Sequence, residues 1–443
     1  MNLLKIFGPA PFTQPIEDPE VIKKQYRYWR IRMFYSMYVG YIAYYLTRKS
    51  FVFAMPAMIT DLGMDKTELG MLITILALTY GASKFLSGII SDRSNPRYFM
   101  SLGLILTGVF NICFGFSSSF LFFALFWGLN GWFQGWGWPP CARLLTHWYS
   151  QSERGSWWSS WNTSHNVGGA IIPLLASYLI EHYHWRIAMF VPGVLSIILG
   201  LLLMERLRDT PQSLGLPSVE KFKNEDKAIQ KANEKPTLSI KETLVEHILR
   251  NKFIWLIAIS YFFVYVVRQA VNDWSQLFLI ETKGYSPLAA GACVFWFEIG
   301  GFFGSIASGW SSDWIFKGKR GPVNVIFTFF VLFAVWWFWK NQLNLVVVDS
   351  ALLFAVGFFV FGPQMLMGVA AAELSHKEAA GTATGFIGWF AYFGAAVAGG
   401  PLGALIKHFG WQGFFIVLAI CSIIAFVLLL PLWNKKTEEK QTV

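Results

Sequence analysis

Apolar runs, each about as long as a membrane-crossing helix, constrain the fold of this chain more than any other feature. A transmembrane helix needs about 20 mostly apolar residues. Only 14% of the 443 residues are charged, whereas an ordinary soluble protein has about 25%. We therefore predict an all-α membrane protein with twelve transmembrane helices. The runs lie at residues 33–55, 68–90, 98–118, 120–142, 160–182, 187–205, 253–278, 288–311, 322–340, 348–371, 380–406 and 411–433.

The twelve runs form two similar sets of six. Arg48 and Arg268 lie 220 positions apart, and Asp92 and Asp313, which follow the second run of each set, lie 221 apart. A repeat with an even number of spans gives two halves that face the same way, which is the major facilitator architecture. We predict this fold with two pseudo-symmetric halves. The expected parts are a cytoplasmic segment 1–32, six-helix halves 33–206 and 252–433, a cytoplasmic linker 207–251 and a cytoplasmic tail 434–443.

The distribution of lysine and arginine predicts the orientation. Cations crowd the N-terminal segment, the linker, the tail and the loops after the second run of each half, whereas the opposite loops hold single cations such as Lys66, Lys283 and Lys340. Cationic loops stay in the cytoplasm. We therefore expect a multi-pass protein of a bacterial inner membrane with both termini inside, surrounded by lipid and monomeric. The net charge of +10 follows from this bias and does not indicate nucleic-acid binding.

Several common features are not expected. The N-terminus lacks the compact apolar core of a cleavable signal peptide. The four cysteines, at positions 113, 141, 293 and 421, have neither metal-ligand nor disulfide spacing and read as buried thiols. Neither a nucleotide-binding glycine loop nor a metal-ligand cluster stands out. We therefore expect no enzyme activity, no metal and no cofactor.

Two arginines stand inside apolar runs. Arg48 lies in "YIAYYLTRKSF" and Arg268 in "YFFVYVVRQAVNDW", each 15 residues after the predicted start of its span. A charge at the bilayer centre costs at least roughly 2.5–3.5 kcal/mol, so such a residue usually has a function. The alternative is an arginine paired with a nearby carboxylate, but Asp273 is five residues beyond Arg268, outside the helical neighbourhood of three or four.

A phosphate group is the ligand that best suits two arginines. Equal depth in two pseudo-symmetric helices would let Arg48 and Arg268 face one another across a central cavity. The guanidinium fork matches phosphate oxygens bidentately. A phosphate monoester carries about −1.5 to −2 charges at neutral pH, which two arginines neutralise. A monocarboxylate would leave a surplus positive charge.

Other polar side chains enter the spans. We expect His165 to adjust the charge of the cavity near neutral pH. Each tyrosine alone fits packing or interfacial anchoring as well as ligand contact. Glu298 is expected to pair with an arginine or lysine, and charge pairing at the gates is expected from Asp92, Arg93 and Asp313. The remaining candidates for the cavity are Lys84, Tyr41, Tyr45, Tyr80, Tyr265, Gln134 and Tyr392.

Five motifs resemble the organophosphate:phosphate antiporter family of the major facilitator superfamily. They are "GYIAYYLTRKSF", "GASKFLSGIISDRSNPR", "FQGWGWPPCARLLTHWYSQSERG", "WNTSHNVGGA" and "VYVVRQAVNDW". The likeness covers nearly the whole chain, and "RDTPQSLGLP" and "VNDW" are most similar to the hexose-phosphate branch, which includes a regulatory sensor. The resemblance implies that Arg48 and Arg268 bind phosphate. It implies that His165, Lys84 and the five tyrosines line the same path.

The resemblance implies import of hexose phosphate, such as glucose 6-phosphate, in exchange for inorganic phosphate. The alternative is a sensor that binds external hexose phosphate and signals through a partner kinase. Two departures affect the choice of sugar. The stretch "AAVAGGPLGAL" lacks an Asp and a Lys of the family's hexose-phosphate carrier, and Phe361 stands where the glycerol-3-phosphate transporter has a tyrosine.

Overall fold

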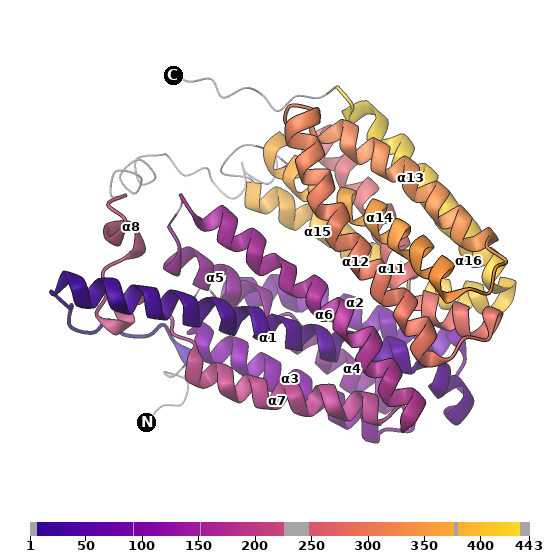
Figure 1. Cartoon of the computed structure of the whole chain (residues 1–443), viewed down its shortest axis with the longest axis horizontal. Coiled ribbons are helices and arrows are strands. Elements are labelled where there is room, and N and C mark those ends of the chain that lie inside the picture. Colours follow the sequence, from indigo (N-terminus) through magenta and orange to yellow (C-terminus); the bar gives the residue numbers. More distant parts are fainter. Residues whose placement is uncertain (1–6, 92, 151, 226–247, 376–379, 435–443) are drawn as a thin grey trace. The chain divides into compact units, whose positions relative to one another are not determined.

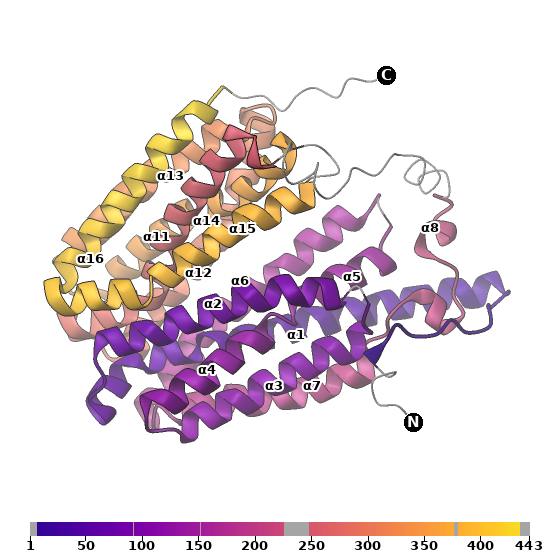
Figure 2. The same cartoon turned by 180° about the vertical axis from the view of Figure 1, so that it is seen from behind.

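The computed structural model describes residues 7–91, 93–150, 152–225, 248–375 and 380–434. Within these ranges the chain is helical and contains no β-strand (Figure 1, Figure 2). The helices are α1 (Pro19–Leu62), α2 (Lys66–Ser91), α3 (Pro96–Phe116), α4 (Phe120–Gln134), α5 (Trp138–Trp148), α6 (Arg154–His182), α7 (Ile187–Arg206), η2 (Pro211–Leu214), α8 (Val219–Phe222), α11 (Lys252–Lys283), α12 (Pro287–Trp310), η4 (Ser311–Ile315), α13 (Arg320–Lys340), α14 (Val346–Leu374), α15 (Ala380–Val397), α16 (Gly400–Leu429) and η6 (Leu430–Leu432).

The helices follow the predicted spans. Eight helical stretches of the described chain are long and apolar enough to cross a membrane, and the last of them, Thr382–Leu432, covers most of two predicted spans. The three other predicted spans fall on α1, on α4 with α5, and on α6. α1 and α6 carry polar side chains along their length, and α4 ends after 15 residues. The all-helical prediction is therefore confirmed.

Glycine and proline interrupt two of the predicted spans. The run 120–142 divides at Gly135 between α4 and α5, and the latter begins with a proline in its first turn. The run 380–406 divides between α15 and α16 at Gly399, again with a proline in the following first turn. Within α16, Gly410 has φ 65°, a backbone conformation that favours glycine, and it separates the last two spans.

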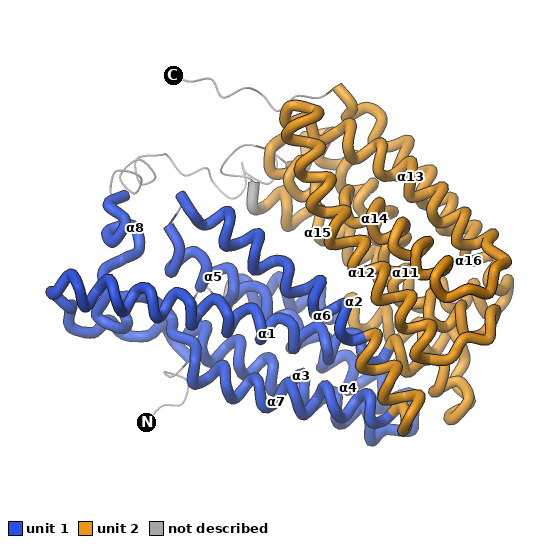
Figure 3. The backbone as a smooth tube through the Cα atoms, in the orientation of Figure 1, with its two compact units in different colours: residues 1–51, 79–172, 186–236 blue, residues 52–78, 173–185, 237–443 orange. Residues whose placement is uncertain are grey.

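The chain forms two compact units (Figure 3). Unit 1 contains residues 1–51, 79–172 and 186–236, and unit 2 contains residues 52–78, 173–185 and 237–443. The end of α1, the start of α2 and the end of α6 thus pack with α11–α16. The predicted boundaries of the six-helix halves concern the internal repeat and stay a prediction.

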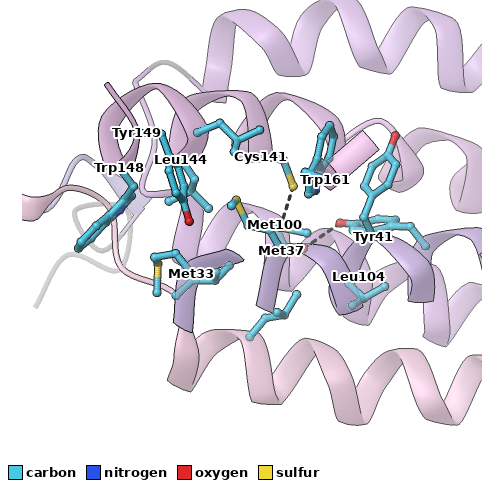
Figure 4. Packing of buried hydrophobic residues seen from close by; sticks show 14 of the residues in the cluster. Met33, Met37, Tyr41, Met100, Leu104, Cys141, Leu144, Trp148, Tyr149 and Trp161 are labelled. Atoms are coloured by element: carbon cyan, nitrogen blue, oxygen red, sulfur yellow. Dashed lines mark hydrogen bonds between the residues drawn. The ribbon is translucent and has the colours of Figure 1, made fainter. Parts of the chain in front are cut away.

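A sulfur-rich and aromatic cluster forms the core of unit 1 (Figure 4). Met100 lies at its centre: its sulfur accepts a hydrogen bond from the Cys141 thiol at 3.6 Å, and its carbonyl accepts one from the Tyr44 hydroxyl at 2.8 Å. Methionine side chains adapt to irregular gaps between aromatic rings. Cysteines 141, 293 and 421 are buried as predicted, whereas Cys113 is only half-buried.

The start of α2 packs on the junction of α15 and α16 inside unit 2. The Thr74 hydroxyl donates to the Ala396 carbonyl at 2.6 Å and accepts from the Gly400 amide at 2.9 Å. A Cβ on Gly70 would lie 2.6 Å from the Gly399 carbonyl oxygen, so the two backbones touch. Absence of a side chain at both positions permits this close approach.

Ion pairs surround this contact. The Lys407 ammonium lies 2.8 Å from a carboxylate oxygen of Asp65, and this hydrogen bond lowers the pKa of the Asp65 carboxyl. The Lys66 ammonium lies 2.7 Å from Glu281, which also accepts from the Trp411 indole at 2.8 Å. Because the side chains of Lys407 and Asp65 are both well exposed, their pair contributes at most about 1 kcal/mol.

Glycines also join α12 to α14. A Cβ on Gly300 would lie 2.1 Å from the Phe354 carbonyl oxygen, and one on Gly304 would lie 1.9 Å from that of Phe358. The reverse contact is as close, because a Cβ on Gly357 would lie 2.0 Å from the Phe297 carbonyl. The GxxxG spacing of Gly300 and Gly304 therefore serves helix packing.

We expect Gly304→Ala to lower the free energy of unfolding by roughly 1–3 kcal/mol, because the added methyl group forces the two backbones apart. Thermal unfolding of the purified protein in detergent measures the change. Gly368→Ala is the matched control: a Cβ there meets nothing within 4 Å, and alanine is the better helix former. Equal melting temperatures for the two variants would refute the packing role of Gly304.

Candidate functional site

Arg48 of α1 lies between two tyrosine rings in unit 1. Its guanidinium carbon is 4.5 Å from the centroid of Tyr45, one turn earlier on the same helix, and 4.3 Å from that of Tyr80 on α2. Its Nε donates to the Oε1 oxygen of Gln134, the last residue of α4, at 3.1 Å. Cation–π contacts and a neutral acceptor stabilise the cation without neutralising it. Two rings and an amide oxygen thus hold the guanidinium in place within unit 1.

Aromatic rings connect Arg48 to α6. Tyr41 lies one turn before Tyr45 at a centroid distance of 5.8 Å and contacts Trp161 of α6 at 4.9 Å. The His165 ring is 5.9 Å from Tyr45, and its Nδ1 contacts the Asn162 carbonyl. His165 is half-buried, so its imidazole can reach a polar medium.

Lys84 of α2 joins the same aromatic series at its other end. Its ammonium lies 5.0 Å from the centroid of Trp138, the first residue of α5. Trp138 contacts Trp158 at 5.7 Å, and Trp158 contacts Trp161 at 6.2 Å. Unit 1 thus brings the predicted residues Arg48, Gln134, Tyr41, Tyr45, Tyr80, His165 and Lys84 into one connected set.

Arg268 of α11 has comparable surroundings in unit 2. The residue is 9% exposed, and its guanidinium carbon lies 4.6 Å from the centroid of Phe361 on α14 and 5.5 Å from that of Tyr265. Tyr265 contacts Tyr392 of α15 at 6.4 Å. Phe361, noted in the sequence as a departure, is thus a direct neighbour of the arginine.

Tyr261 is a site residue that the sequence analysis missed. Its ring lies 4.8 Å from that of Tyr265, and its hydroxyl donates to the Gln364 carbonyl at 3.0 Å. The positions Tyr41, Tyr45 and Arg48 recur at Tyr261, Tyr265 and Arg268, each 220 residues later. The same offset that relates the two arginines could have identified this tyrosine. Trp138, Trp158 and Trp161 were also missed, since no spacing distinguishes them from the other tryptophans.

The residues predicted to form charge pairs differ in their partners and in their exposure. Asp313 pairs with Arg320, whose Nη2 also lies 2.9 Å from a Glu373 oxygen. Glu298 is buried and accepts a hydrogen bond from Asn272 at 2.7 Å. Its pairing with an arginine or lysine stays a prediction. Arg93 is exposed, and Asp92 lies outside the described residues.

A metal centre is not indicated in the part of the chain that the structure describes, where no three His, Cys, Asp or Glu side chains gather closely enough to hold an ion. The arrangement in each unit instead offers an arginine in contact with aromatic rings, among them tyrosines that carry hydroxyl groups. Such a set can bind an oxyanion and the hydroxyl groups of an attached sugar.

Comparison with known proteins gives a consistent result. The sequence profile of the Major Facilitator Superfamily matches residues 37–399. A probable hexose phosphate transport protein of Chlamydia muridarum is 58% identical over 98% of both chains. The membrane sensor protein UhpC of Escherichia coli is 48% identical over 97% of this chain and 98% of its own. The glycerol-3-phosphate transporter of Bacillus subtilis is 41% identical over 98% of both chains.

Solved structures agree on the fold. The chain is similar to a crystal structure of a bacterial homolog of the human lysosomal transporter Spinster in an inward-facing, unoccupied conformation. The TM-score is 0.71 and the identity 14%, and the match covers 91% of this chain and 96% of the other. At this identity the likeness concerns the fold alone.

Proposed function

The chain belongs to the Major Facilitator Superfamily, and from this premise we propose that it imports hexose phosphate in exchange for inorganic phosphate. The observation that carries the proposal is the repeated set of two tyrosines and an arginine, Tyr41, Tyr45 and Arg48 with Tyr261, Tyr265 and Arg268. The 58% identity with probable hexose phosphate transport proteins supports the same substrate.

Both arginines are proposed to bind the phosphate group. Each keeps a guanidinium among aromatic rings, and Arg268 is buried. Two guanidinium groups match the charge and the oxygen geometry of a phosphate dianion. Lys84, His165 and Tyr392 are proposed to contribute to the same binding path, and the hydroxyls of the tyrosines to contact the sugar.

Exchange follows from the charge of the empty carrier. We propose that the positive charge of the two arginines in a low-dielectric site opposes reorientation of the empty carrier, and that a bound phosphate or sugar phosphate offsets this charge. Each half-cycle therefore requires an anion. We propose that inorganic phosphate leaves and hexose phosphate enters by rocking of two helical halves around the binding site, as is general for this superfamily.

Transport into liposomes tests this proposal. Purified protein is placed in liposomes preloaded with inorganic phosphate, and labelled glucose 6-phosphate is supplied outside. We expect accumulation that requires internal phosphate and that falls strongly in Arg268→Lys. Liposomes without internal phosphate are the control. Saturable binding without internal counts would reject the exchange function.

That outcome would favour a second candidate, a membrane sensor for external hexose phosphate acting through a partner kinase. The observation in its favour is the 48–49% identity with the UhpC sensor proteins of Escherichia coli and Salmonella typhimurium. A sensor would use the same binding residues and needs only one stable liganded state. Turnover alone separates the two functions.

Glycerol 3-phosphate is the competing substrate to be measured beside glucose 6-phosphate. The stretch 395–405 lacks the Asp and Lys of the hexose-phosphate carrier, and a phenylalanine, Phe361, contacts Arg268. Much faster uptake of glycerol 3-phosphate than of any hexose phosphate would overturn the hexose assignment and leave phosphate exchange intact.

His165→Ala is expected to weaken phosphate binding and to change how the affinity depends on pH between about 5 and 8. An ordinary imidazole gains its proton in this range, and the added charge near Tyr45 favours an anionic ligand. Phosphate affinity measured across this range in both proteins checks the result. A pH profile parallel to that of the unaltered protein would reduce His165 to a packing role.

The setting of this function is proposed from the sequence. From the positively charged loops we propose that both termini lie in the cytoplasm of a bacterium and that the chain lies in its inner membrane. We propose a monomer without a cofactor, in which Asp92, Arg93, Asp313 and Glu298 take part in charge pairing as the halves move. We propose that the protein transports its substrate and does not change it chemically.

A further inference from the structure

A series of hydrogen-bonded amides leads away from Arg48 into unit 1. Gln134 accepts from Arg48 through Oε1 at 3.1 Å and donates through Nε2 to the Asn130 Oδ1 at 3.1 Å. Asn130 donates through Nδ2 to the Asn111 Oδ1 at 3.3 Å. Asn111 donates through Nδ2 to the Met189 carbonyl at 2.7 Å. We call Gln134, Asn130 and Asn111 the amide relay.

The relay connects four helices and is sealed from solvent. Arg48 is on α1, Asn130 and Gln134 lie one turn apart on α4, Asn111 is on α3, and Met189 is on α7. All three amide side chains are 0% exposed. Buried amides are costly unless each donor and acceptor has a partner, and here both ends of every amide have one.

The direction of the relay is set at its far end. A backbone carbonyl can only accept, so the Met189 oxygen requires the NH₂ group of Asn111 and turns its Oδ1 toward Asn130. A second carbonyl, that of Thr107, accepts from the Asn130 NH₂ at 3.4 Å and imposes the same direction. The Asn130 oxygen then faces the Gln134 NH₂, which leaves the Gln134 oxygen for Arg48.

Hydroxyl groups support this direction. The Ser50 hydroxyl donates to the Asn111 oxygen at 3.3 Å. The Thr47 hydroxyl donates to the Tyr44 carbonyl at 3.2 Å, and its oxygen accepts from the Gln134 NH₂ at 2.9 Å. A reversed Gln134 would place an NH₂ group against the Arg48 Nε–H, where two donors repel one another.

We propose that Asn111 and Asn130 are positioning residues that act through Gln134 to orient the Arg48 guanidinium toward phosphate. The proposal rests on the proposed function, because it assumes that Arg48 binds the anion. With Nε held by Gln134, the terminal nitrogens of the guanidinium present a fixed edge to the ligand. Orientation before binding reduces the entropy lost when the ligand is bound.

Leucine substitutions test the relay through the affinity for inorganic phosphate, measured on the full-length purified protein by calorimetry. We expect Asn130→Leu and Asn111→Leu each to weaken binding about three- to tenfold, and Gln134→Leu by a similar factor. The number of binding sites per protein should not change. Asn324→Leu is the matched control: this asparagine near the start of α13 is 1% exposed and belongs neither to the relay nor to the proposed site, so the affinity of this variant for phosphate should stay unchanged.

The double variant Asn130→Leu with Gln134→Leu gives the sharpest test. If Asn130 acts only through Gln134, the double variant binds phosphate as weakly as Gln134→Leu alone and no weaker, since residues in one hydrogen-bond network are not additive. Losses that multiply would overturn the relay, and so would unchanged affinity in the Asn130 and Asn111 variants or a fall in site number at unchanged affinity. In each of these cases the proposed function stands as long as the unaltered protein binds phosphate. If the unaltered protein did not bind phosphate, both the relay and the proposed function would be overturned.

Discussion

Lysine in place of Arg48, and separately in place of Arg268, is expected to lower phosphate exchange by about tenfold to a hundredfold. Lysine keeps the charge but loses the planar fork that binds two phosphate oxygens at once. A hydrogen bond to a charged group contributes roughly 1.5–3 kcal/mol, which corresponds to this factor. Lysine also loses the contacts of the Arg48 guanidinium with the rings of Tyr45 and Tyr80. Labelled phosphate exchange in proteoliposomes measures the effect.

Arg186→Lys is the matched control for this prediction. Arg186 also uses its fork, with hydrogen bonds of 2.7 and 2.6 Å to the carbonyls of Gly115 and Ser117, but it lies at the start of α7 and outside the proposed site. We expect exchange within about twofold of the unaltered protein, because this half-buried arginine lies outside the proposed site. Exchange close to normal in either site variant would contradict the proposed role of that arginine.

The helices were predictable because lipid imposes one requirement on every span. A backbone in hydrocarbon must satisfy its own hydrogen bonds, so an apolar run of about 20 residues can only be helical. Runs such as 322–340 and 187–205 therefore match α13 and α7 almost to the residue. The runs that divided, 120–142 and 380–406, contain glycine and proline, which mark a break without saying how far the helix bends.

The internal repeat could have predicted more residues of the candidate site than the two arginines. The offset that relates Arg48 to Arg268 also relates Tyr45 to Tyr265, and the ring one turn before each arginine contacts its guanidinium in both units. A spacing of three positions between a ring and a cation places them on one helix face, so this contact follows from spacing alone. The partner from another helix differs, with Tyr80 in one unit and Phe361 in the other.

The amide relay could not be predicted from the sequence. Asn130 and Gln134 are four residues apart, which indicates a shared face. Asn111 lies on another helix, and its contact with Asn130 depends on how α3 and α4 are rotated against each other. Rotation is decided by the packing of many side chains, and no single residue records it. The direction of the relay depends further on two backbone carbonyls, which have no signature in the sequence.

Glutamate in place of Gln134 is expected to weaken phosphate binding by about a hundredfold or more. The change adds a charge to a side chain of nearly the same shape, 3.1 Å from the Arg48 Nε. Two opposite charges about 4 Å apart attract by roughly 4 kcal/mol at an effective dielectric constant of 20. The introduced carboxylate would therefore neutralise Arg48 and compete with phosphate for it. Equilibrium binding of inorganic phosphate measures the loss.

The relay makes this substitution differ from a simple ion pair. The second carboxylate oxygen would replace the NH₂ group that now donates to the Asn130 oxygen, and two acceptors would then face each other. Relief requires Asn130 and then Asn111 to reverse, which would bring the Asn111 oxygen against the Met189 carbonyl. Gln134→Leu is the comparison, because it removes the amide without adding charge and should lose much less affinity. Equal affinities in the two variants would mean that Arg48 does not supply charge to the bound phosphate.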